Sequence, residues 1–261
     1  MNKLSYWVPF KYLLATDLHL FKKLIKDKLI NLCIWVSSSA LIATYVLPFF
    51  GMSNNYGSFL LVGLCASAGL FEVFPSVAKL VDDMQGDQVI LYQVTLPLPS
   101  WLVILRLMIY NAFSAFILGL CVLPLGKLLL WNNFDLANFS FFKFLLIFSL
   151  GSAFYGSYTI FIATRVPGMT QIGNVWMRFV YPLWFLGGYQ FSWQALHGIA
   201  PILAYINLAN PILYIMEGIR GAVLGQPGYL PFGLCVGMVF LFCIISIITG
   251  IRLLKKRLDI L

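Results

Sequence analysis

The chain has 261 residues, of which 61% are hydrophobic and only 10% are charged, and its mean hydropathy is +0.90. Soluble domains are about 45–50% apolar and about 25% charged, so this composition excludes an ordinary soluble protein and indicates several membrane-spanning segments. The formal net charge is +8, but the basic residues lie in short connections and at the chain ends, where they orient a membrane protein. We therefore expect no nucleic-acid partner.

The first 28 residues interleave lysines with apolar residues, whereas a signal peptide places a short basic patch before an apolar run. We therefore expect this segment to be retained. Apolar residues between Phe10 and Ile25 recur at helical spacing, and Lys22, Lys23 and Lys26 occupy the other side. The pattern predicts a basic amphipathic interface helix over residues 1–28 on the cytoplasmic membrane surface, where it binds anionic lipid, a cytoplasmic partner, or both.

Six apolar runs follow, each close to the ~20 residues that cross a bilayer. They cover residues 29–50, 57–78, 102–125, 140–163, 172–189 and 229–252. The predicted fold class is therefore an all-α integral membrane protein, with about six transmembrane helices in one domain over residues 29–261. Because six crossings return the chain to its starting side and basic residues follow the last run, both termini are expected in the cytoplasm of a multi-pass protein of the cell (inner) membrane.

The cytoplasmic connection 79–101 is long enough to have structure of its own. It contains an acidic cluster that includes Asp83, and it ends in Leu96-Pro97-Leu98-Pro99. The residues between, 86–94, can form two helical turns, which the prolines would stop. Such a helix is a docking surface by its position, and the alternative from the pattern alone is a solvated hairpin connection.

A second long connection, residues 189–228, lies on the outer side. Glycines and prolines prevent one continuous span here, yet most residues are apolar or aromatic, so we expect short interfacial or re-entrant helices that satisfy the backbone near lipid. The last of these helices is expected to begin at Pro211, a residue favoured in the first helical turn. Glu217 and Arg220 are three residues apart, hence on one helix face, and are expected to pair as a brace.

A few polar residues fall within or beside the predicted spans. Glu72 is a candidate for the transport pathway, and the alternative is that it reaches the interface or pairs with a basic neighbour such as Arg178. Arg106 and Arg178, near span ends, are expected to anchor at the interface. Aromatic residues around the fifth span predict an interfacial belt or, alternatively, a lining that stacks on sugar rings. Because His19 and His197 are isolated, we expect no metal site.

The residues of two segments resemble a known family. Asn210-Pro211-Ile212-Leu213-Tyr214-Ile215-Met216-Glu217-Gly218-Ile219-Arg220-Gly221 is similar to the Asn-Pro-x-x-Tyr-x-x-Glu-x-x-Arg-Gly segment before the last span of type 2 ATP-binding-cassette exporter permeases. The connection 79–101 is similar to the coupling loop of that family, with Asp83, Gly86, Leu96 and Pro97 in comparable places. The resemblance implies that these four residues couple the chain to an ATPase, and that Asn210, Pro211, Tyr214, Glu217 and Arg220 belong to an exit-side helix.

The resemblance also implies partners. These are cytoplasmic ATP-binding-cassette ATPase subunits, a second permease chain in a homodimer, and membrane lipid. The chain would bind no cofactor itself, because ATP is hydrolysed by the partner subunit. Consistent with this, the sequence nearest to a phosphate-binding loop, residues 121–128, lacks the first glycine and has Leu128 where a serine or threonine must bind magnesium. We therefore expect a transport subunit that is not an enzyme.

Alternatives remain open for the transported cargo and for the class of protein. The expected cargo is a drug-like amphipathic compound or a lipid, and the alternative is a lipid-linked polysaccharide. Two other classes are an ion-coupled secondary transporter, which would show internal repeats and paired broken helices, and an integral membrane lipid enzyme, which would need a His/Asp or Ser/His constellation.

Overall fold

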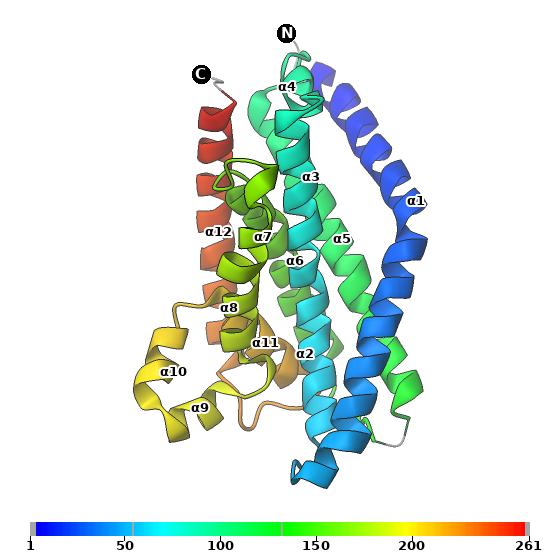
Figure 1. Cartoon of the computed structure of the whole chain (residues 1–261), viewed down its shortest axis with the longest axis vertical. Helices are drawn as coiled ribbons and strands as arrows, with labels where there is room; N and C mark the ends of the chain where they lie inside the picture. The colour runs from blue at the N-terminus through cyan, green and yellow to red at the C-terminus, as the bar shows by residue number, and fades with distance from the viewer. Residues whose placement is uncertain (1–3, 54, 132, 259–261) are drawn as a thin grey trace.

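The computed structural model describes residues 4–53, 55–131 and 133–258, and every regular element within these ranges is a helix. The expected domains at the two ends of the chain include residues 1–3 and 259–261, which lie outside the described residues. Figure 1 shows an elongated bundle. The start of α1 (Leu4–Leu41) and the end of α12 (Phe232–Arg257) lie at one end, which we call the terminal end, and α9 (Trp193–Ile199) and α10 (Pro201–Asn207) lie at the opposite end, which we call the distal end. The predicted all-α membrane fold class is confirmed.

Among the described residues, five helical segments are long and apolar enough to cross a membrane, or six if the bent pair α10 (Pro201–Asn207) and α11 (Pro211–Val223) forms one span. They are α1 (Leu4–Leu41), which continues through a π-helical turn (Ile42–Val46) and a 3-10 turn (Leu47–Phe50); α2 (Tyr56–Phe71) together with α3 (Val73–Gln85); α5 (Ser100–Leu129); α6 (Phe141–Ala163); and α12 (Phe232–Arg257). The amphipathic residues before position 29 form the first part of α1, which continues into the first span without a helical break.

The predicted fifth span, residues 172–189, has a different construction. It consists of α7 (Gly173–Val175), a π-helical stretch (Trp176–Val180), α8 (Tyr181–Trp184) and a second π-helical stretch (Phe185–Tyr189). Pro182 cannot donate a hydrogen bond to the carbonyl of Arg178, and its ring crowds that carbonyl, which accounts for a widened turn before it. These four segments together, residues 173–189, are called the fifth helical run below. The fifth helical run extends toward the distal end in Figure 1 but is not one long regular helix.

Three short helices precede the last span at the distal end. They are α9 (Trp193–Ile199), α10 (Pro201–Asn207) and α11 (Pro211–Val223). The axes of α10 and α11 meet at 97°, and all residues of α11 are buried. The prediction of re-entrant or interfacial helices before the last span agrees with this bent, re-entrant-like pair, in which Pro211 begins α11. The helix α11 packs inside the bundle against α6 and α12.

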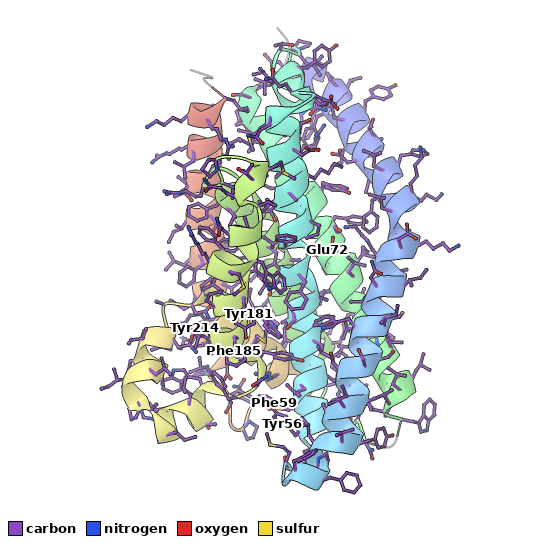
Figure 2. The ribbon with its side chains drawn as sticks, in the orientation of Figure 1. Tyr56, Phe59, Glu72, Tyr181, Phe185 and Tyr214 are labelled. Atoms are coloured by element: carbon purple, nitrogen blue, oxygen red, sulfur yellow. The ribbon has the colours of Figure 1, made fainter. Side chains whose placement is uncertain are left out.

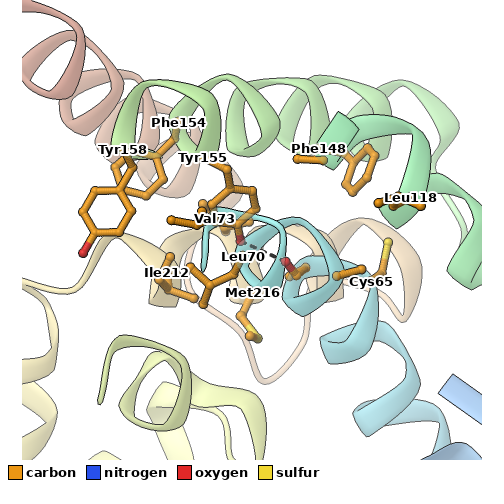
Figure 3. Packing of buried hydrophobic residues seen from close by; sticks show 14 of the residues in the cluster. Cys65, Leu70, Val73, Leu118, Phe148, Phe154, Tyr155, Tyr158, Ile212 and Met216 are labelled. Carbon is orange, nitrogen blue, oxygen red and sulfur yellow. Dashed lines mark hydrogen bonds between the residues drawn. The ribbon is translucent and has the colours of Figure 1, made fainter. Parts of the chain in front are cut away.

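The core depends on close approach between helices at small residues, as is usual in membrane bundles. A Cβ atom at Gly156 of α6 would lie 2.3 Å from the carbonyl oxygen of Met108 on α5, and one at Gly218 of α11 would lie 2.7 Å from Ile147 on α6. Figure 3 shows Tyr155 of α6 directed at α2, where its hydroxyl donates to the carbonyl of Ala66 at 3.0 Å. These contacts fix α6 at the centre of the bundle.

Candidate functional site

The connection 79–101 contains a short helix, α4 (Val89–Val94), at the terminal end. The Oδ1 atom of Asp83 accepts a hydrogen bond from the backbone N–H of Val89 at 3.1 Å, and Oδ2 accepts one from Ile90 at 3.0 Å. The residue directly before α4, Gln88, provides no side-chain cap and has a left-handed φ of 51°. Asp83 therefore caps α4 from the end of α3, which satisfies two amides that the short helix leaves without internal partners.

The other residues predicted in this loop shape its two turns. The N–H of Gly86, at the end of α3, donates to the carbonyl of Asp82 at 2.8 Å. After α4, the N–H of Leu98 donates to the carbonyl of Leu96 at 2.6 Å, which makes a tight turn around the exposed Pro97. Leu98 then packs with Phe10 of α1 and with the start of α5, so the loop is in contact with α1.

The outward face of α4 is apolar. Ile90 is buried, whereas Val89, Leu91 and Tyr92 are exposed, with 66% of Tyr92 accessible. A helix thus exists within the predicted residues 86–94, but it begins only at Val89, and it presents an apolar surface at the terminal end of the bundle.

Two further contacts hold the terminal end together, and the sequence reasoning missed both. Arg257 of α12 donates to the carbonyls of Ala163, of Val166 at 2.6 Å and of Pro167 at 3.3 Å. Gln85 of α3 accepts from the N–H of Met169 at 2.9 Å. The basic residues after the last span indicated only the orientation of the chain. A single glutamine in the predicted connection 79–101 has no distinctive sequence pattern.

Glu72 lies between α2 and α3 and faces α1 (Figure 2). Its carboxylate forms an ion pair with Lys28 of α1 and accepts a hydrogen bond from the Ser114 hydroxyl of α5 at 3.0 Å. Of the alternatives for Glu72, pairing with a basic residue is found, but the partner is Lys28 and not Arg178, whose side chain is exposed on the fifth helical run. Lys28 was missed since it is distant in sequence and was assigned to the interface helix.

The structure also corrects the prediction for the Arg106 side chain. It was expected to anchor at the interface, yet only 4% of it is exposed, and its Nε lies 3.0 Å from Oδ2 of Asp17 on α1. An arginine in this surrounding needs a carboxylate partner, because an unpaired charge there is costly. Both ion pairs found among the described residues therefore join α1 to the rest of the bundle.

The first residues of the predicted exit-side helix fix the corner between α10 and α11. The Asn210 side chain accepts from the N–H of Ile212 at 3.0 Å, as a helix cap, and donates to the carbonyl of Leu183 at 2.9 Å. Pro211 occupies the first turn. The Tyr214 hydroxyl donates to the carbonyl of Leu208 at 2.7 Å.

The predicted pairing of Glu217 with Arg220 is wrong. The two carboxylate oxygens of Glu217 accept from the backbone N–H groups of Trp193 at 3.1 Å and Leu230 at 2.9 Å. Glu217 and Arg220 are both fully buried, and each forms hydrogen bonds with backbone groups of the segments beside α11. In such surroundings an unpaired backbone group costs more than an ion pair on a helix surface contributes.

Arg220 binds the end of the fifth helical run. Its guanidinium donates to the carbonyls of Gly188 and of Tyr189, the latter at 2.8 Å, and lies 3.6 Å from the centre of the Phe59 ring. Figure 2 places Phe59 at the distal end. Arg220 and Glu217 therefore hold three backbone segments and the Phe59 ring around α11.

The comparison with known families agrees with the resemblance drawn from the sequence. The family model described as ABC-2 type transporter matches residues 19–224. A search of curated proteins finds no match. The matched region comprises most of the chain and includes α4, the fifth helical run and the whole of α11. The chain belongs to the ABC-2 type transporter family, as the membrane permease subunit of an exporter, and it has no ATPase site of its own.

Proposed function

We propose that α4 is the surface through which cytoplasmic ATPase subunits drive this permease. The observation that carries the proposal is the apolar outward face of α4, formed by Val89, Leu91 and Tyr92 at the end of the bundle. Exposed apolar residues grouped on one surface are typical of a protein interface. Asp83, Gly86, Leu96 and Pro97 position this face by capping α4 and shaping its flanking turns.

The contacts of the loop suggest how movement of α4 would reach the spans. Leu98 packs against Phe10 of α1 and against Leu102 and Val103 of α5. A push on α4 would therefore displace α1 and α5 together, while the ion pairs of Asp17 and Lys28 keep α1 attached. Nucleotide that binds the closed ATPase pair more tightly than the open pair would shift the permease between two arrangements.

The proposed orientation of the chain in the membrane follows from the distribution of its basic residues. The terminal end would face the cytoplasm, because Lys255, Lys256 and Arg257 end α12 there. The first part of α1, to residue 28, would reach the cytoplasmic membrane surface, where the exposed Lys22, Lys23 and Lys26 would face lipid headgroups. The membrane domain would follow from residue 29. A second copy of the chain would complete the export path as a homodimer in the cell (inner) membrane.

The proposed cargo is a drug-like amphipathic compound or a lipid. Both classes partition into the bilayer and can reach a path between helices laterally. A lipid-linked polysaccharide is the second candidate, and the aromatic stacking of Tyr181 with Phe185 on the fifth helical run favours it, because sugar rings pack on such faces. Either cargo would use the same coupling.

The coupling proposal is tested with Tyr92→Glu in the permease co-expressed with its ATPase. A charge on the docking face should lower the ATPase activity recovered per permease chain by about tenfold, the scale of an interface hot spot. Tyr205→Glu is the matched control, since Tyr205 is 61% exposed but lies on α10 at the distal end. Equal ATPase recovery with both variants would refute docking at α4.

A further inference from the structure

The distal end contains a cavity of about 770 Å³, a size typical of small-molecule sites. Its walls come from the start of α2, the connection between α5 and α6, the segment before α9, and the segment after α11. Figure 2 shows Tyr56 and Phe59, which belong to this lining, at the distal end. None of the coupling residues contributes to the cavity.

The lining is polar in a chain that is otherwise very apolar. Side-chain amides of Asn55, Asn138 and Gln190 line the cavity together with Asp135 and several serines. The aromatic rings of Tyr56, Phe59, Phe191 and Tyr229 supply flat apolar surface beside them. The described lining residues include neither lysine nor arginine.

Hydrogen bonds between the walls give the cavity a fixed shape. The Tyr56 hydroxyl donates to the carbonyl of Gln190 at 3.1 Å, and the Ser58 hydroxyl donates to the carbonyl of Asn133 at 2.7 Å. Both bonds join residues of α2 to segments far away in the sequence. They use main-chain carbonyls, so the side-chain amide of Gln190 is not consumed by them.

The two buried charged residues of α11, Glu217 and Arg220, support the walls of the cavity from inside the bundle. Arg220 stacks on the ring of Phe59, which is a lining residue. Glu217 holds the N–H of Trp193, next to the lining Ser192, and the N–H of Leu230, next to the lining Tyr229. A cavity supported in this way is preorganised, which lowers the cost of ordering its walls when a ligand binds.

We propose that this distal cavity binds a neutral, polyhydroxylated group such as a sugar ring. Amides both donate and accept, as sugar hydroxyls do, and the carboxylate of Asp135 can accept from them. The aromatic rings can pack on the apolar face of a sugar. An anion would meet Asp135 without a lysine or arginine in the lining, and an apolar ligand would leave the amides unpaired, which is costly.

The sugar has two sources, a glycolipid headgroup or a free saccharide. In the proposed orientation the cavity opens on the outer side, where both can be present. The inference goes beyond the coupling proposal, because it concerns binding at the end of the molecule opposite to α4. It is tested without nucleotide and without the ATPase, so its failure would leave the coupling proposal standing.

The test measures binding to the full chain in nanodiscs. One arm incorporates diglucosyl diacylglycerol, with plain diacylglycerol as its reference, and the other arm titrates free maltose. Saturable binding of the glycolipid alone assigns the headgroup as the source, and saturable binding of maltose assigns the free sugar. Either result supports the site only if the variants below weaken it.

The variant that removes the site chemistry is Asn138→Ala combined with Gln190→Ala. Loss of two hydrogen-bonding side chains should weaken binding about tenfold or more. Gln194→Ala is the control, because Gln194 is exposed on α9 but is not part of the lining. An unchanged thermal unfolding midpoint shows that the double variant is folded. Absence of saturable binding in both arms, or equal affinity in the double variant and the control, would overturn the proposal.

Discussion

The two ends of the bundle use polar residues in opposite ways. At the distal end, Glu217 and Arg220 are fully buried and hold three backbone segments and the Phe59 ring around α11. At the terminal end, Asp83 caps a six-residue helix whose apolar face remains exposed. Substitution of Glu217 or Arg220 should therefore act on folding, whereas substitutions in α4 and its cap should act on communication with a partner.

The largest expected effect is loss of stability in Arg220→Met. The substitution removes the donors to Gly188 and Tyr189 and the stacking on Phe59. Two buried carbonyls would remain unpaired, so the free energy of unfolding should fall by about 3 kcal/mol or more. Thermal unfolding in nanodiscs, followed by size-exclusion chromatography, measures the loss. A midpoint equal to that of the natural chain would show that the guanidinium does not support the distal end.

The next effect concerns the attachment of α1. Glu72→Leu alone leaves Lys28 without its carboxylate, and it should lower the free energy of unfolding by about 2 kcal/mol. Addition of Lys28→Met should recover at least half of that loss, because no charge is then left unpaired. The complete double-mutant cycle is read by the same unfolding assay. Additive losses would indicate that the two side chains do not interact.

A smaller effect is expected at the cap of α4. Asp83→Ala removes the acceptor for two backbone amides and should cost about 1 kcal/mol locally. We expect stimulation of the ATPase by the permease to fall several-fold while the global unfolding midpoint remains unchanged. Asp87→Ala is the matched control, since Asp87 is an exposed carboxylate in the same loop. Similar stimulation in the two variants would argue against a role for the cap.

The smallest perturbation tests which end faces the cytoplasm. In a Cys33→Ser background, Asp87→Cys should react with an impermeant maleimide only after the cells are opened, and Pro227→Cys should react in intact cells. Both positions are exposed, so neither change should affect folding. The reverse labelling pattern would invert the proposed orientation and place α4 outside.

The helices were largely predictable because hydrophobic runs and proline positions act locally. The apolar runs became α1, α2 with α3, α5, α6 and α12. Pro211 indicated the start of α11, and the residues before Pro97 indicated α4. The fifth run was predicted as an apolar span, but its π-helical turns were not, because a widened turn depends on how Pro182 is accommodated by neighbouring helices.

The sequence by itself determined the membrane class and the all-helical fold, because composition and local spacing encode burial, and its resemblance to the ABC-2 family pointed to α11. Only the tertiary structure decided the partners of the charged residues. Lys28 and Glu72 are far apart in the chain, and Glu217 and Arg220 are close in the chain but bind different segments. Within a low-dielectric bundle, a charge takes whichever neighbour satisfies it most completely, and that neighbour is set by helix packing and not by spacing along the chain.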